Sequence, residues 1–314
     1  MSRRILVIGA AGMIGRKLTA RLAREGMGEL ILHDVVPFEG SSMVSDLSVP
    51  GEAEKLVAKR PDLIFHLAAI VSGEAEADFE KGYRTNLDGT RRLFEAVRKE
   101  GGGAAGPYRP KIIFTSSIAV FGAPFPEAIG DEFLNAPLTS YGTQKAIGEL
   151  LLSDYSRRGF FDGIGIRLPT ICVRPGKPNK AASGFFSGIL REPLAGQEAV
   201  LPVPDTVRHW FASPRAAIEF LIHASKINTE LLGARRNLSM PGLSATIAEE
   251  IEALRRVGGE KAVRLIRRQP DPTIMRIVEG WPRNFDAKRS LALGFRADPS
   301  FDDIVRYHVA DELS

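Results

Sequence analysis

Short apolar runs alternate with amphipathic stretches through the first half of the chain. The apolar runs are bounded by turn-forming or polar residues, and they predict strands at residues 5–8, 30–32, 63–67, 112–114 and 163–168. The stretches between them repeat their apolar positions at helical spacing and predict helices at residues 13–25, 51–59, 79–100 and 141–158. This alternation predicts an α/β fold in which helices cover both faces of a doubly wound parallel sheet.

The pattern changes after Pro169. Proline and glycine become dense there and the periodicity weakens, which indicates a smaller C-terminal lobe. A short run at residues 237–240, followed by helical spacing at 247–256, indicates that the chain returns to the sheet. The expected parts are a sheet domain at 1–168 with a return strand near 235–258, and a lobe at 169–234 and 259–314.

The composition excludes several classes of partner. The 42 lysine and arginine residues and 38 aspartate and glutamate residues give a net charge of +4 without a long basic run, so nucleic acid is not an expected partner. No apolar run approaches the roughly 18–20 residues that span a bilayer, and the N-terminus lacks the pattern of a signal peptide. Cys172 is the only cysteine, so no intrachain disulfide can form. We expect a cytoplasmic protein without a membrane partner, and we assign no metal ligands.

A glycine-rich segment joins the first predicted strand to the first predicted helix. It carries Gly9, Gly12 and Gly15 in the sequence GAAGMIG. Glycine allows a tight turn there and lets the backbone approach a pyrophosphate at the positive end of the helix. We therefore predict a dinucleotide-binding site of the Rossmann type, to which Met13 and Ile14 also belong.

An aspartate ends the second predicted strand, 19 residues after the last glycine of this segment. The carboxylate of Asp34 can accept hydrogen bonds from both hydroxyls of an adenosine ribose, and it would repel a 2′-phosphate. Val35 and Val36 follow it and supply no arginine to hold such a phosphate. The sequence therefore favours NAD over NADP, and we expect Asp46 and Leu47 to border the adenine.

A tyrosine and a lysine lie four residues apart in the last predicted helix of this domain. Tyr141 and Lys145 share one helix face, with Cβ atoms about 5–6 Å apart. Free tyrosine ionises near pH ~10, but a nearby ammonium and a bound nicotinamide cation both favour the phenolate, which can then act as a base. Ser117 closes the preceding strand and is placed to hydrogen-bond the reacting oxygen, with Ser116 as the alternative.

Together these motifs resemble those of the extended short-chain dehydrogenase/reductase family. The similarity covers nearly the whole chain and adds HLAA at 66–69, NLDGT at 86–90 and TSSIAVFG at 115–122, in family order. The resemblance implies an enzyme whose sheet domain binds NAD and whose catalytic triad is Ser117, Tyr141 and Lys145. The triad's Tyr141 and Lys145 would also contact the cofactor, and the further cofactor residues implied are Ala68, Ala69, Asn86, Ser116, Pro169 and Ile171. Ser72 and Ser117 would contact the substrate.

Many members of this family are nucleotide-sugar epimerases and dehydratases, and this chain departs from them at two places. Their segment after the fifth major strand ends in an asparagine that contacts the nucleotide diphosphate, and Thr170 stands at that position here. A later stretch binds phosphate in those relatives. In this chain it keeps only the arginine, Arg208, and the aromatic character. The missing asparagine argues against the large nucleotide pocket of an epimerase.

The segment at 167–196 is instead similar to dehydrogenases that oxidise D-erythronate, a four-carbon sugar acid, at C2. It carries four basic residues within eighteen positions, which are Arg174, Lys177, Lys180 and Arg191. A guanidinium can bind a small carboxylate through two parallel hydrogen bonds. We expect Arg174 to hold the carboxylate, with Arg208 as the second choice. Lys177 and Asn179 would complete the contacts to the acid.

Three functions are compatible with these residues. The first is a dehydrogenase that uses NAD to oxidise a small-molecule substrate, a short sugar acid, at C2. The second is a nucleoside-diphosphate-sugar 4-epimerase, in which the cofactor is not consumed and the substrate is a nucleotide sugar. The third is a non-catalytic dinucleotide sensor, which the retained Tyr141 and Lys145 argue against. The family resemblance also allows a homodimer, because helices of this fold often pair between subunits.

Overall fold

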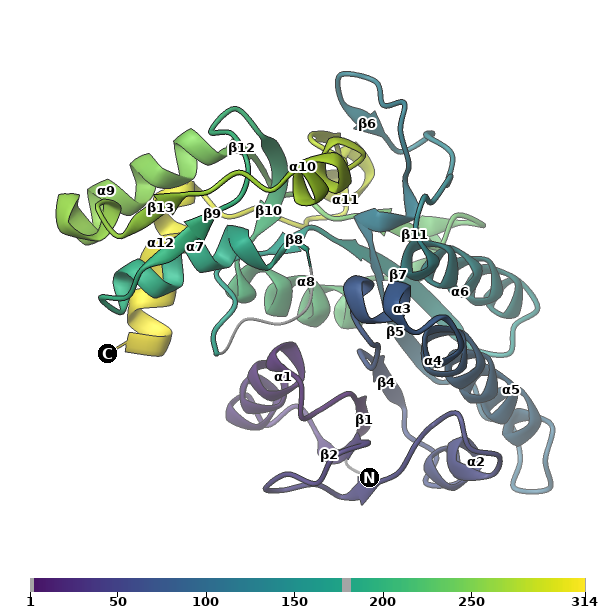
Figure 1. Cartoon of the computed structure of the whole chain (residues 1–314). Coiled ribbons are helices and arrows are strands. Elements are labelled where there is room, and N and C mark those ends of the chain that lie inside the picture. The colour runs from purple at the N-terminus through teal and green to yellow at the C-terminus, as the bar shows by residue number, and fades with distance from the viewer. Residues whose placement is uncertain (1–2, 177–181, 314) are drawn as a thin grey trace. The chain divides into compact units, whose positions relative to one another are not determined.

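The computed structural model describes residues 3–176 and 182–313, so Lys177, Asn179 and Lys180 lie outside the described residues. The chain forms two compact units (Figure 1). Unit 1 comprises residues 1–120, 139–167 and 218–238, and unit 2 comprises residues 121–138, 168–217 and 239–314. Among the described residues, no helix is long and apolar enough to cross a membrane.

Unit 1 is built on a seven-stranded sheet with the strand order β3-β2-β1-β4-β5-β7-β11. The strands are β1 Arg4–Ile8, β2 Glu29–Asp34, β3 Met43–Val44, β4 Leu63–His66, β5 Lys111–Ser117, β7 Asp162–Leu168 and β11 Asn237–Ser239. The pairs β1–β2, β1–β4, β2–β3 and β4–β5 are parallel. Starting from β1, the sheet continues on one side with β2 and β3 and on the other side with β4, β5, β7 and β11. Because crossovers between parallel strands are right-handed, this order places helices on both faces, which confirms the doubly wound α/β fold.

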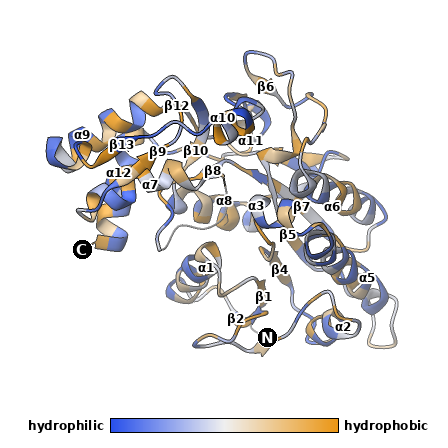
Figure 2. Cartoon of the chain, viewed as in Figure 1, coloured by the Kyte–Doolittle hydropathy of each residue, from blue (hydrophilic) through white to orange (hydrophobic). Residues whose placement is uncertain are grey.

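The central strands β1 and β4 carry continuous apolar runs because parallel strands are covered on both faces. Every residue from Ile5 to Ile8 is fully buried, as are Leu63, Ile64 and Phe65. Figure 2 shows apolar colours on these strands, whereas a covering helix such as α5 carries both colours. The helical elements of unit 1 are α1 Met13–Arg24, α2 Glu52–Val57, α3 Ser72–Ala77, α4 Phe79–Gly82, η1 Tyr83–Asp88, α5 Gly89–Gly101, η2 Ile118–Val120, α6 Ser140–Arg157, α8 Pro214–Lys226 from residue 218, and η3 Thr229–Leu232.

The single helix predicted at 79–100 is three elements in the structure. α4 is followed by one π-helical turn, η1, and then by α5. A π turn adds one residue to the repeat of an α-helix, and the apolar spacing does not reveal this change. Asn86 lies in the π turn, so the irregular segment belongs to the predicted cofactor site.

Unit 2 has its own smaller sheets and its own apolar core. Its strands are β6 Ile129–Gly130, β8 Thr170–Ile171, β9 Ala199–Leu201, β10 Arg208–Ala212, β12 Leu243–Thr246, β13 Ile266–Arg268 and β14 Phe285–Asp286. β10 pairs with β12 and β8, while β9–β13 and β6–β14 form separate pairs. The helical elements are α7 Gly184–Leu194, α9 Ile247–Val263, α10 Pro272–Glu279, α11 Lys288–Ala292, α12 Phe301–His308 and η4 Val309–Leu313. α9 packs on α7 and α12 around Phe186, Phe211 and Leu254.

These units divide the chain differently from the expected ranges in three segments. Residues 121–138 belong to unit 2, because β6 pairs with β14 and Phe121 packs on Phe285. Residues 218–234 belong to unit 1 rather than to the lobe. Residues 239–258 belong to unit 2, because the apolar face of α9 lies in that unit's core. The predicted roles, cofactor binding for one part and substrate binding for the other, are not fixed by this division.

Candidate active site

The glycine-rich turn of unit 1 packs so closely on neighbouring backbone that two of its glycines leave no room for a side chain. Gly9 has φ of +90°, and a Cβ atom on it would lie 2.7 Å from the backbone nitrogen of Ala68. A Cβ atom on Gly15 would collide with the carbonyl oxygen of Gly9. Gly12 precedes α1 without a side-chain cap, and the first turn of α1, with Met13 and Ile14, carries no acidic residue. The open, positive N-terminus of α1 therefore fits the pyrophosphate of a dinucleotide.

The carboxylate of Asp34 lies against this turn. Its Oδ2 accepts a hydrogen bond from the backbone N–H of Ala11 at 2.8 Å, and its Oδ1 accepts from Val35 at 2.8 Å and Val36 at 3.3 Å. An ionised carboxylate offers about four acceptor positions, so these contacts leave capacity for ribose hydroxyls. Asp34 thus orders the glycine-rich turn in addition to its predicted role at the ribose.

Asp46 and Leu47 differ in how they could meet an adenine. Oδ1 of Asp46 accepts hydrogen bonds from the N–H and hydroxyl of Ser48 at 2.9 and 2.7 Å. Burial raises the pKa of Asp46, but these hydrogen bonds and the charge of Arg84 outweigh burial and lower the pKa overall. Leu47 is buried in the apolar core of unit 1. Its contact with a cofactor stays a prediction.

Asn86 holds the loop that follows β4. Its Oδ1 accepts from the N–H of Ile70 at 2.9 Å, and its Nδ2 donates to the carbonyl of Ile70 at 3.2 Å and to Oε1 of Gln144 at 2.7 Å. The side chain is buried. Asn86 therefore joins the loop of Ala68 and Ala69 to α6, and its predicted direct contact with the cofactor stays untested.

The two serines at the end of β5 face different surroundings. Ser116 is buried and donates to Oε1 of Glu149 at 2.5 Å. Ser117 is half-buried, and its Oγ accepts from the N–H of Ala119 at 3.2 Å. Successive side chains of a strand point to opposite faces. This difference supports Ser117 over Ser116 as the serine that reaches a substrate.

Tyr141 and Lys145 lie in the first two turns of α6, as their spacing predicts. Nζ of Lys145 lies 5.8 Å from the centroid of the Tyr141 ring and 4.9 Å from that of Phe114, and it donates to the carbonyl of Thr115 at 2.8 Å. Burial lowers the pKa of Lys145 to about 8. The ammonium and the positive end of α6 both favour ionisation of the half-buried Tyr141.

A buried histidine behind Lys145 was not predicted. Nε2 of His66 lies 2.8 Å from Oγ1 of Thr90, which itself donates to the carbonyl of Asn86. Burial, and secondly the charge of Lys145, lower the pKa of His66 to about 3, so the imidazole is neutral near pH 7. The segment HLAA contains His66, but nothing in its spacing points to this contact.

The structure also shows a buried ion pair that the sequence analysis missed. Glu149 is 1% exposed, and its two oxygens accept from Nε and Nη2 of Arg167 at 2.9 and 2.8 Å. Glu149 lies four residues after Lys145, so the spacing from Tyr141 through Lys145 to Glu149 was a usable signal.

The two arginines predicted to hold an acid both lie in unit 2. Arg174 is half-buried, with its N–H donating to Oγ of Ser187 at 2.9 Å and its Nε donating to the carbonyl of Ile171 at 3.2 Å. Arg208 donates to the carbonyl of Ser244 at 2.9 Å and forms an ion pair with Glu249 at 3.4 Å. Arg174 stays the first choice because it lies five residues after Pro169, the start of the predicted nicotinamide loop.

Thr170 lies beside a second buried histidine in unit 2. Its Oγ1 is 2.7 Å from Nε2 of His209, whose ring stacks on Phe186 with centroids 5.0 Å apart. Burial lowers the pKa of His209 to about 3. Thr170 follows the buried Pro169, and its hydroxyl is paired with His209 at the position where the family resemblance would place an asparagine. Ser72, the remaining predicted substrate contact, opens α3 in unit 1 and is half-buried.

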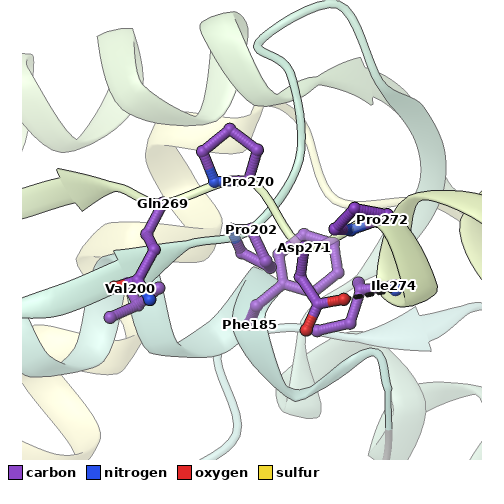
Figure 3. Close-up of a pocket in the computed structure, with 8 residues that line it drawn as sticks. All are labelled: Phe185, Val200, Pro202, Gln269, Pro270, Asp271, Pro272 and Ile274. Carbon is purple, nitrogen blue, oxygen red and sulfur yellow. Dashed lines mark hydrogen bonds between the residues drawn. The ribbon is translucent and has the colours of Figure 1, made fainter.

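A pocket of about 510 Å³ lies in unit 2, and its lining contains none of the predicted site residues. Figure 3 shows its lining, which is mostly apolar and proline-rich: Phe185, Val200, Pro202, Gln269, Pro270, Asp271, Pro272 and Ile274. The carboxylate of Asp271 accepts from the N–H groups of Thr273 and Ile274 and so caps α10. Asp271 is the one ionisable residue of this lining, and its carboxylate is engaged in that cap, so the pocket is not the candidate site.

Comparisons with known proteins agree with the nucleotide-binding architecture. The model of the NAD dependent epimerase/dehydratase family matches residues 5–212. The chain is 45% identical to a D-erythronate dehydrogenase of Cupriavidus necator, over 98% of each chain. It is 40% identical to a D-erythronate dehydrogenase of Haemophilus influenzae, over 99% of this chain and all of that protein. A solved structure described as a nucleoside-diphosphate-sugar epimerase from Agrobacterium tumefaciens is 65% identical, with a TM-score of 0.94, over 99% of this chain and 94% of that one.

Proposed function

The chain belongs to the NAD-dependent epimerase/dehydratase family, and we propose that it oxidises a short sugar acid of the D-erythronate type at C2. The similarity to two D-erythronate dehydrogenases covers almost the whole of this chain and almost the whole of each relative. The observation that carries the proposal is the buried Lys145 ammonium at the Tyr141 ring, which suits removal of a proton from an alcohol. A net oxidation needs such a base and a hydride acceptor.

The chemistry assigned to the chain is proton transfer and positioning. The cofactor supplies the hydride acceptor when it is bound. Tyr141, as phenolate, takes the proton of the C2 hydroxyl while the C2–H bond breaks, and the product is the 2-oxo acid. The hydroxyl of Ser117 holds the reacting oxygen. Lys145 supplies the positive charge that keeps Tyr141 ionised near neutral pH.

NAD is the proposed cofactor rather than NADP. Asp34 keeps acceptor capacity beside the glycine-rich turn, and its charge repels a 2′-phosphate. Val35 and Val36 follow Asp34 and offer no cation for that phosphate.

The proposed grip on the substrate carboxylate comes from Arg174. A four-carbon acid has little apolar area, so its binding rests on a few directed polar contacts. Arg174→Met keeps most of the aliphatic side chain but removes the guanidinium group. The kcat/KM for D-erythronate should then fall on the order of 10²-fold or more. Arg208→Met is the matched variant. A larger loss in Arg208→Met than in Arg174→Met would move the carboxylate site to Arg208.

The alternative is a nucleoside-diphosphate-sugar 4-epimerase. The description of the Agrobacterium tumefaciens structure favours it, at 65% identity. Thr170 argues against it, because a threonine held by His209 stands where the epimerases carry their diphosphate-binding asparagine.

One assay separates the two functions. NADH absorbance is followed with a panel of aldonic acids, and UDP-sugars are tested in parallel for interconversion. Formation of NADH with D-erythronate is the expected result. An enzyme that ignores D-erythronate, binds UDP tightly and interconverts UDP-sugars without net NADH would be an epimerase instead.

A further inference from the structure

One face of α6 carries three ionisable side chains in succession. Tyr141, Lys145 and Glu149 are spaced four residues apart, so they lie above one another along the helix. Lys145 is 3% exposed and Glu149 is 1% exposed. The face therefore runs from the predicted base, through its ammonium neighbour, to a carboxylate that water does not reach.

Glu149 connects two strand ends to this helix face. Its Oε1 accepts from Oγ of Ser116 at 2.5 Å, and Ser116 immediately precedes Ser117 at the end of β5. Both of its oxygens accept from Arg167, at 2.9 and 2.8 Å, near the end of β7. Arg167 is two residues before Pro169, the start of the predicted nicotinamide loop. One carboxylate thus touches the two segments that lead directly into the predicted catalytic and cofactor residues.

We propose that Glu149 is a positioning residue, which fixes Ser117 and Lys145 relative to each other and supplies the negative charge that keeps Lys145 cationic. Its two effects have one cause, since the same buried carboxylate is hydrogen-bonded to β5 and β7 and lies one helical turn from the ammonium. This inference rests on the proposed function for the roles of Ser117 and Lys145.

The charges around Lys145 show why Glu149 matters. Burial lowers the pKa of Lys145, and Glu149 raises it against that effect. His66, on β4, is neutral near pH 7 and adds no charge. Arg167, on β7, is paired with Glu149 and 11% exposed. Tyr141 on α6, as the proposed phenolate, carries a negative charge that also favours the ammonium. Without the carboxylate, Lys145 would lose its proton at lower pH.

The first measurement is the ionisation of Lys145 itself, which does not depend on activity. The protein without cofactor is labelled with ε-¹³C lysine, and the Lys145 signal is assigned by its loss in Lys145→Met. An NMR titration then gives the pKa of Lys145. In Glu149→Gln the pKa should fall by about one unit relative to the wild type. Glu250→Gln, the same change at a buried glutamate of unit 2, should leave it unchanged.

A second variant separates the carboxylate from the ion pair. Arg167→Met breaks the same pair but keeps Glu149, so the pKa of Lys145 should not fall. Should Glu149→Gln alone fail to fold because Arg167 is left unpaired, the double variant Glu149→Gln/Arg167→Met removes both charges and is expected to fold. Its Lys145 pKa should also be lower than that of the wild type.

Activity supplies the matching readout. In Glu149→Gln the alkaline limb of the kcat/KM profile should move to lower pH together with the pKa of Lys145, whereas a merely structural defect would reduce activity without moving the limb. An unchanged Lys145 pKa in Glu149→Gln, or an equal fall in Arg167→Met, would overturn the proposal. A wild-type protein that oxidises no sugar acid would refute the proposed function, while the NMR titration would still decide the role of Glu149.

Discussion

Each unit of the protein contains a fully buried glutamate, and the two have opposite surroundings. Glu149, in unit 1, accepts from Arg167 and Ser116. Glu250, in unit 2, is 0% exposed, and neither of its carboxylate oxygens has a hydrogen-bond partner among the described residues. Burial raises the pKa of Glu250 well above its usual value and so favours the protonated, neutral form of this side chain.

The difference teaches that burial alone does not decide what a carboxyl group does. Removing a charge from water costs several kcal/mol, which an interior cation and hydrogen bonds can offset. At Glu149 they do, and a charge is kept beside the predicted active site. At Glu250 no partner is described, and the group avoids the cost by holding its proton. We propose a positioning role for the paired acid and assign none to the unpaired acid.

The largest expected effect is on stability in unit 1. Glu149→Ala leaves the guanidinium of Arg167 buried without its carboxylate, which should lower the free energy of unfolding by about 3–5 kcal/mol. Urea denaturation of the protein without cofactor measures it. Glu250→Gln, which leaves no uncompensated charge, serves as the comparison. Equal losses of unfolding free energy in the two variants would show that the Glu149–Arg167 pair does not determine the cost of replacing Glu149.

The next effect is on turnover and not on stability, and it comes from a second residue of the same helix. Tyr141→Phe deletes only the ionisable oxygen, so turnover of the sugar acid should fall at least ~10²-fold. The urea midpoint and NAD binding should change little. Tyr155→Phe is a matched control in α6, because its hydroxyl contacts Glu95 and not Lys145. Near-normal turnover in Tyr141→Phe would remove the proposed base.

A smaller effect is expected at the cofactor. Asp34→Ala removes the charge that opposes a 2′-phosphate, and the preference for NAD over NADP in kcat/KM should narrow by roughly 1–3 kcal/mol. Asp154→Ala, a change at an exposed aspartate of α6 that pairs with Arg157, should not alter the preference. Equal preference in Asp34→Ala and the wild type would take Asp34 out of the ribose site.

The sequence predicted the longer strands of unit 1 because they contain apolar runs, and the α6 pair because four-residue spacing fixes a shared face. It did not predict the two-residue edge strand β3, which is too short to form such a run. It could not predict the π turn at Asn86, since one added residue leaves the apolar pattern nearly intact. It also could not pair Glu149 with Arg167. They are 18 residues apart, on a helix and the following strand, and only the folded sheet brings them together.

The glutamate of unit 2 did leave a signal in the sequence. Ile247, Glu250, Ile251 and Leu254 follow the spacing of one helix face, and all four are buried. Glu249 beside them instead completes a capping box with Thr246. Two adjacent glutamates therefore have different roles, and the helical period separates them. What the period does not reveal is whether a buried acid has a partner, because that depends on other segments.

The smallest expected effect tests the unpaired acid itself. A carboxyl whose pKa is raised in the folded state stabilises the fold fully only below its unfolded pKa, and this contribution is lost as the pH rises toward the folded pKa. The unfolded reference is 4.5, and the folded pKa lies well above it. Wild-type stability should therefore fall relative to Glu250→Gln as the pH rises above the unfolded pKa, by up to about 1.4 kcal/mol for each pH unit until the pH reaches the folded pKa. Urea denaturation of both proteins at several pH values measures the difference, in which all other titrating groups cancel. A difference that does not change with pH would mean that Glu250 is ionised in the folded protein, and the contrast with Glu149 would then disappear.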